Sequence, residues 1–121
     1  GAERQLSNKV NPSVSDNPQK QELARLFDES EVDRPPILLK KIQPVYPLIA
    51  REMQLEGVVK LKFTVSAAGI VEDIKIVSES VKNIFGRNAI DAVKKWKFNP
   101  GLIKNKPVNT SVTIDIKFKL E

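Results

Sequence analysis

The residue types able to do chemistry in this sequence are few, because it contains no histidine and no cysteine. Without histidine the usual general base, the commonest metal ligand and every serine–histidine arrangement are excluded. Without cysteine there are no disulfides, thiolate metal sites or cysteine nucleophiles. Glu52, Glu56, Glu72 and Asp73 offer carboxylates, but no spacing pairs them and no activated nucleophile accompanies them. We therefore expect no enzymatic activity, no bound metal and no cofactor.

The only tyrosine stands at the entrance of a helix-like stretch, IQPVYPLIAREMQLEGVV (42–59). Pro47 suits the first helical position, because its fixed φ fits a helix and the first turn does not need its missing N–H. Tyr46 precedes a proline and is therefore expected to be extended. Gly57 is expected to supply the left-handed stop. These preferences explain the prolines and leave two roles open for Tyr46: contact with a partner, or packing that fixes the helix entry.

The charge balance favours a solvated surface over a nucleic-acid face. Lys and Arg number 20 against 15 Asp and Glu, a net charge of +5, but no basic cluster contains interleaved aromatic residues. Lys94, Lys95 and Lys97 complement a helix dipole better than they would a phosphate site. No apolar run reaches the roughly 20 residues of a membrane span, and no signal peptide is visible. The chain as given is expected to be soluble, and Gly1-Ala2 suggests a fragment from which a targeting sequence was removed.

The predicted order of elements is helix, strand, strand, helix, strand, preceded by a tail. Residues 1–34 are interpreted as a flexible tail or linker, because they hold too few apolar residues to bury a face. A short helix is expected at 21–28, where Leu23, Leu26 and Phe27 share one side. The folded domain is predicted at 35–121. It contains helices over 47–56 and from Asn83 as N-cap to Pro100, strands over 58–66, 70–78 and 109–120, an edge strand at 37–42 and a loop at 102–108.

Apolar periodicity predicts which faces are buried. Residues 58–66 and 109–120 alternate apolar and polar side chains, as half-buried strands do. Between 70 and 78 Glu72 breaks the alternation, which indicates a bulge or a strand covered on both faces. The predicted fold is α+β: a two-layer sandwich whose three-stranded antiparallel sheet, with a short extra edge strand, is covered on one face by two helices. The helices would bury Leu48, Ile49, Met53 and Leu55 from the first, and Phe85, Ala89, Ala92, Val93 and Trp96 from the second.

A series of short motifs follows one order along the chain. QPVYP (43–47), AREMQLEGVVKLKFTVSAAGIV, NAIDAVKKWKFNPG and KPV precede a terminal VTIDIKFKL. In this order they resemble the C-terminal domain of TonB, from about Pro35 to Leu120. Each motif alone is weak, and together they are specific. Asn105 stands where many relatives have glycine, and asparagine also tolerates a left-handed turn.

The resemblance implies a non-enzymatic periplasmic domain of a protein anchored in the inner membrane of a Gram-negative bacterium. TonB proteins use the proton gradient through ExbB and ExbD, which act on an N-terminal part absent from this chain. Their C-terminal domain grips the TonB box of outer-membrane transporters for siderophores, iron and similar cargo. In that family the box adds as a strand beside the last strand, here an open edge over 109–119. The implied partner contacts are Gln43, Tyr46, Asn109, Ser111, Thr113, Asp115, Lys117 and Lys119.

Other interpretations stay open beside this one. A TonB-like module of another envelope assembly, such as a secretion or motility complex, would keep the fold without a role in transport. A soluble TonB-like protein would lack the anchor. An open edge strand also makes a strand-exchanged homodimer physically reasonable. Trp96 and Phe98 are expected in the core in every case.

Overall fold

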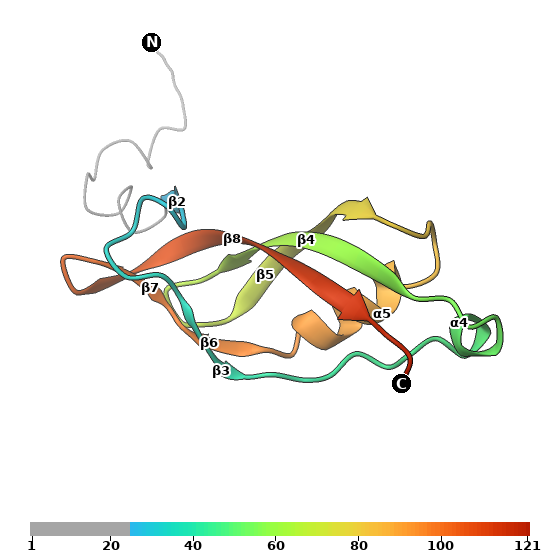
Figure 1. Ribbon diagram of the computed structural model, residues 1–121. Helices are drawn as coiled ribbons and strands as arrows, with labels where there is room; N and C mark the ends of the chain where they lie inside the picture. Colours follow the sequence, from blue (N-terminus) through green and yellow to red (C-terminus); the bar gives the residue numbers. More distant parts are fainter. Residues whose placement is uncertain (1–24) are drawn as a thin grey trace, which may run out of the picture.

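The computed structural model describes residues 25–121, and its centre is a curled antiparallel sheet of three long strands (Figure 1). β4 (Gly57–Val65) lies in the middle, with β5 (Val71–Glu79) on one side and β8 (Lys106–Phe118) on the other. Both pairings are antiparallel. The three strands expected from the alternation are confirmed, although β8 begins before the expected residue 109.

Two helices, α4 (Leu48–Glu52) and α5 (Gly86–Val93), complete the predicted α+β class. α5 lies against one face of the sheet, and α4 lies at the end of the domain (Figure 1). Within residues 25–121 neither helix is long and apolar enough to cross a membrane. The N-cap of α5 is Phe85, and the expected cap, Asn83, instead has a left-handed backbone with φ 62°.

The apolar stripe expected of the second helix is buried, but the helix ends earlier than predicted. Phe85, Ala89 and Val93 are fully buried. Beyond Val93 the chain turns and forms β6 (Lys97–Asn99), although a helix was expected as far as Pro100. Trp96 fitted the apolar pattern of the helix because the turn after Val93 places its indole on the same buried side as the helix stripe. Trp96 is 5% exposed there.

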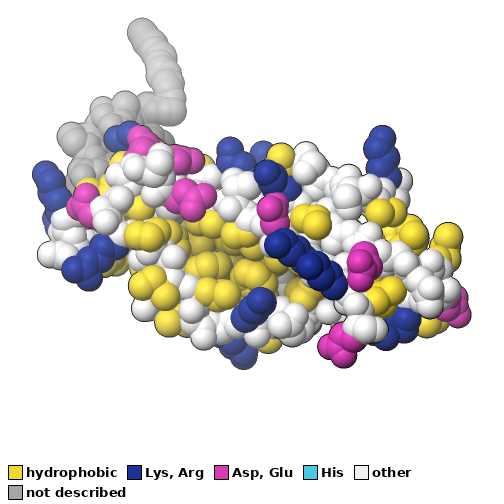
Figure 2. Space-filling view, in the orientation of Figure 1, with side chains coloured by type: hydrophobic (Ala, Val, Ile, Leu, Met, Phe, Trp, Pro, Cys, Tyr) yellow, Lys and Arg dark blue, Asp and Glu magenta, His cyan; other side chains and the backbone are white. Residues whose placement is uncertain are grey.

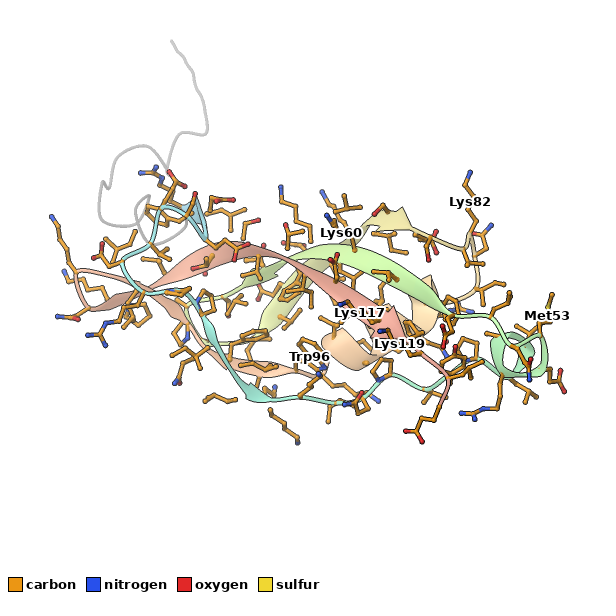
Figure 3. All side chains as sticks on the ribbon, viewed as in Figure 1. Met53, Lys60, Lys82, Trp96, Lys117 and Lys119 are labelled. Atoms are coloured by element: carbon orange, nitrogen blue, oxygen red, sulfur yellow. The ribbon has the colours of Figure 1, made fainter. Side chains whose placement is uncertain are left out.

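α4 corrects the prediction for the first helix. Leu48, Ile49 and Met53 were expected in the core, but their exposed fractions are 70%, 56% and 60%. The helix has only five residues, so it offers a single turn to the sheet, and that turn contributes Ala50, which is fully buried. Leu55 packs against the core as expected. Figure 2 shows the resulting hydrophobic side chains on the surface at this end, and Figure 3 shows Met53 pointing away from the sheet.

Short strands form where no strand or only a loop was expected. β2 (Leu26–Asp28) is paired with β8, so the helix expected at 21–28 is wrong for these residues, and the folded part begins before residue 35. Residues 21–24 of that helix lie outside the described residues. β7 (Gly101–Ile103) folds back on β8 through a turn in which Lys104 and Asn105 have φ of 51° and 65°, so the loop expected at 102–108 is a hairpin.

The edge strand expected at 37–42 is present as β3 (Ile37–Lys40). It pairs antiparallel with β6 in a separate two-stranded sheet. β6 also carries Phe98 into the core, where its ring centroid lies 5.9 Å from that of Phe63. Phe98 is 9% exposed, so its predicted core position is confirmed.

The bulge expected in the second strand is present in β5. The register with β4 shifts between Lys62 and Thr64, whose partners are Lys75 and Glu72. Asp73 lies in this bulge and has φ 52°, a left-handed conformation that aspartate tolerates better than most residues. The hairpin glycine before β5, Gly69, has φ 82°, and any side chain there would clash with the carbonyl oxygen of Phe98.

Candidate functional site

Over residues 109–118, the edge of β8 that faces away from β4 is divided into two halves. β2 pairs with Asn109–Ser111 in the first half. β7 pairs with Lys106–Val108, before the stretch of β8 that pairs with β4. Beyond Ser111, no strand among residues 25–121 pairs with this edge up to Phe118. The expectation that all of 109–119 is an open edge is therefore wrong for 109–111.

The backbone groups of alternate residues in β8 point to this edge. The carbonyl oxygen of Ser111 accepts a hydrogen bond from the Glu29 N–H at 3.1 Å, and the Thr113 N–H donates to Glu29 Oε2 at 3.1 Å. In an antiparallel strand the N–H and C=O of one residue point to the same side, and neighbouring residues alternate. Asp115 and Lys117 therefore present their N–H and C=O groups to the same edge, while Ile116 faces β4.

A chain segment with the tyrosine motif runs beside this half of β8. We call residues 41–47 the arm. The Trp96 indole Nε1 donates to the Ile42 carbonyl at 2.8 Å, and Asn88 Nδ2 donates to the Val45 carbonyl at 2.7 Å, so two side chains fix the arm through its backbone. Figure 3 shows Trp96 close to the end of β8, where Lys117 lies and after which Lys119 follows.

Between the arm and the strand lies a shallow groove of about 230 Å³, which we call the β8 groove. Its charged side chains are exposed, and the lysines outnumber the single acid, Asp115. Exposed charges of this kind affect the rate and orientation of an encounter more than they affect affinity. The groove is lined by Lys41, Gln43, Pro44, Trp96, Asp115, Ile116 and Lys117.

Tyr46 packs at the end of the core. Its ring makes edge-on contacts with Phe85 and Phe118 at centroid distances of 5.7 and 5.8 Å, and its hydroxyl donates a hydrogen bond to the Leu55 carbonyl. Burial raises the pKa of Tyr46 above its ordinary value, and the Glu56 carboxylate acts in the same direction. The hydroxyl therefore stays protonated at neutral pH and remains a donor. Of the two roles left open by the sequence, these contacts show the packing role.

Comparison with known proteins decides the family. Residues 42–120 match the family model for the Gram-negative bacterial TonB protein C-terminal region. The chain belongs to the TonB C-terminal family. It is 36% identical over 90 residues to Protein TonB of Vibrio cholerae and 40% identical over 85 residues to Protein TonB of Klebsiella aerogenes. These matches cover 74% and 70% of this chain but only 37% and 33% of the relatives, so the chain spans about a third of their length.

Solved structures of TonB domains share the fold. The solution structure of the Pseudomonas aeruginosa TonB C-terminal domain aligns with a TM-score of 0.62 at 32% identity, covering 71% of this chain and 87% of that one. The TonB2 protein of Vibrio anguillarum aligns with a TM-score of 0.55 at 35% identity, covering 70% and 81%. Family membership identifies this chain as a non-enzymatic, periplasmic TonB C-terminal domain.

The structure brings together part of the predicted TonB contact set. Gln43, Asp115 and Lys117 line the β8 groove. Tyr46 and Lys119 line a second hollow, of about 470 Å³, at the end of β8. Two residues of the set lie elsewhere, because β2 covers them: Asn109, whose side chain accepts the Ala67 N–H, and Ser111, which is 7% exposed. Thr113 is exposed, but its N–H is bonded to Glu29.

Sequence reasoning missed several residues of this TonB site. Lys41 and Pro44 lie within two residues of Gln43 in the arm, so their place in the sequence could have indicated that they belong to the same site. Trp96 was predicted only as core and also forms part of the groove wall. Glu29 lies 84 residues from the Thr113 N–H that it binds, and no local pattern marks it.

The packing role of Tyr46 leads to a testable expectation for this TonB domain. Tyr46→Phe keeps the ring contacts but leaves the Leu55 carbonyl without its donor. The midpoint temperature of thermal unfolding should therefore fall by a few degrees. Leu48→Ala on the exposed side of α4 is the control and should leave the midpoint unchanged. An unchanged midpoint for Tyr46→Phe, combined with weaker peptide binding, would assign Tyr46 to partner contact instead.

Proposed function

We propose that this domain grips the TonB box of outer-membrane transporters by strand addition to residues 113–119, which comprise the C-terminal half of β8 and the residue after it. Through that grip it transmits energy derived from the proton gradient for substrate uptake, including siderophore and iron uptake. One observation carries the proposal: half of this edge already holds a strand of the same chain, β2, while the other half holds none among the described residues.

The geometry of the edge supports recognition through the backbone. Strand addition needs N–H and C=O groups that point outward, and alternate residues from Thr113 to Lys117 supply them. The outward side chains are small or charged, so they add little sequence selectivity of their own. The arm forms a second wall of the groove, and Gln43 lines that wall. In this proposal the Gln43 amide bonds the added strand.

The rest of the proposal concerns the whole protein. We propose that an N-terminal segment outside this chain anchors it in the inner membrane and couples it to ExbB and ExbD. A second copy of the chain could use the same edge, which would give a strand-exchanged homodimer in competition with the peptide. A TonB-like module of another envelope assembly is the alternative, and the experiment below separates the two.

The experiment is a titration of the ¹⁵N-labelled chain with synthetic TonB-box peptides copied from transporters of the source organism, followed by NMR. We expect amide shifts along 113–119 and at Gln43, and none for peptides with scrambled sequence that carry a proline at every second position. Shifts confined to Lys94, Lys95 and Lys97 would move the site to the charged end of α5. Absence of shifts with every transporter peptide would favour the other envelope assembly.

A further inference from the structure

The occupied half of the edge shows how a strand is accepted there. β2 runs parallel to β8, with Leu26, Phe27 and Asp28 opposite Asn109, Thr110 and Ser111. The ladder continues for one more residue, because the Glu29 N–H donates to the Ser111 carbonyl at 3.1 Å. The chain thus fills the N-terminal half of this edge with its own strand.

The side chain of Glu29 extends this coverage by one position. Its Oε2 accepts the outward Thr113 N–H at 3.1 Å, in the place where a carbonyl oxygen of a partner strand would bond. A partner strand that pairs with Thr113 must first remove this carboxylate. We call β2 and Glu29 together the strap.

The strap is held by few contacts. β2 has three residues, of which only Phe27 is buried, at 8% exposed, while Leu26 is 51% exposed. The Arg25 guanidinium lies 4.4 Å from the Phe27 ring centroid on the outside. A short edge strand with one buried side chain opens at lower free energy than the β4, β5 and β8 ladders.

The segment that follows the strap is anchored independently. The N–H groups of Asp33 and Arg34 donate to the Leu102 carbonyl at 2.8 and 3.1 Å, and the Leu102 N–H donates to the Arg34 carbonyl at 2.9 Å. A displaced β2 therefore stays tethered beside β8. Tethering gives it a high effective concentration, so it competes with a free peptide for the same edge.

We propose that the strap is an internal competitor that sets the length of partner strand the domain accepts. This rests on the proposed function and deepens it by naming a regulatory element of the same site. A short strand that pairs only with residues 115–119 binds beside the strap. A longer strand must displace Glu29 and then β2, and its affinity is lowered by that competition.

The first test compares variants of Glu29 in the full chain, using a TonB-box peptide of about five residues and an extended version of about nine, since strands pair residue by residue. Glu29→Ala should raise affinity for the longer peptide by about threefold to tenfold, as expected for removal of one competing hydrogen bond. It should leave the short peptide unchanged. Glu29→Gln keeps an oxygen acceptor and serves as the matched control, with a smaller gain. In the Ala variant the Thr113 amide should also exchange faster with solvent.

The second test locks the strap in place. The chain has no cysteine, and Asp28 lies opposite Ser111, so Asp28→Cys with Ser111→Cys provides a disulfide across the pair. The oxidised form should bind the longer peptide at least about tenfold more weakly than the same protein after reduction, because the locked strand cannot leave. Its affinity for the short peptide should be the same in both states.

The outcomes separate this inference from the proposed function. Equal affinity for the longer peptide in oxidised, reduced and Glu29→Ala proteins, with shifts along 113–119, would overturn the strap and leave the proposed function intact. Binding that is absent in every form would overturn both.

Discussion

Trp96→Ala is expected to destabilise the domain by about 3–5 kcal/mol, the usual range for removing a buried tryptophan. Trp96 is 5% exposed, and its ring centroid lies 6.3 Å from that of Phe98. The substitution leaves a cavity under the arm and removes the indole donor of the Ile42 carbonyl. Because Trp96 is the only tryptophan, unfolding by denaturant should be followed by circular dichroism and not by fluorescence.

Trp96→Phe separates packing from the anchoring of the arm. Phenylalanine keeps most of the buried area but has no donor for Ile42, so the loss of stability should be smaller. Peptide affinity should still fall, because one of the two side-chain bonds that position the arm is gone. If Trp96→Ala unfolded at the wild-type denaturant concentration yet failed to bind peptide, Trp96 would belong to a recognition surface and its core assignment would be wrong.

Proline at position 115 or 117 is expected to abolish peptide binding while the fold survives. The N–H groups of Asp115 and Lys117 point away from β4, so proline removes no bond of the β4 ladder. It does delete a donor that an added strand would use. Circular dichroism should therefore match the wild type, while NMR titration with a TonB-box peptide should show no saturable shift.

Two sets of controls make the proline result specific. Ile116→Pro should unfold or strongly destabilise the domain, because Ile116 faces β4 opposite Val59. Lys117→Gln and Thr113→Ser change side chains without deleting a donor and should cost roughly 1 kcal/mol of binding or less. Proline at 111 is not a test of this edge, since Ser111 pairs with β2. Peptide binding at wild-type affinity by both Asp115→Pro and Lys117→Pro would contradict backbone pairing.

The sequence alone determined the elements whose signals are local. The alternation in 58–66 and 109–120 predicts two strands, because a strand with one buried face needs an apolar residue at every second position. The stripe from Phe85 to Val93 predicts the face of α5 in the same way. The order of motifs was sufficient to indicate the TonB family, since those motifs mark turns, helix entry and core positions that recur with the fold.

Tertiary structure alone decided how the edge of β8 is shared. β2 has three residues and no periodicity of its own, so its strand conformation depends on β8, which is about 80 residues away in sequence. Tertiary structure also decided where α5 ends, because the residues after it form β6, which pairs with β3. Leu48 is exposed because α4 has only five residues and buries a single turn against the sheet. Strand pairing and helix docking are contacts between segments that are distant in sequence. Local propensity therefore does not indicate which segment a strand or helix will pack against. For this reason the sequence predicted the binding strand, and only the folded chain showed which half of it is open.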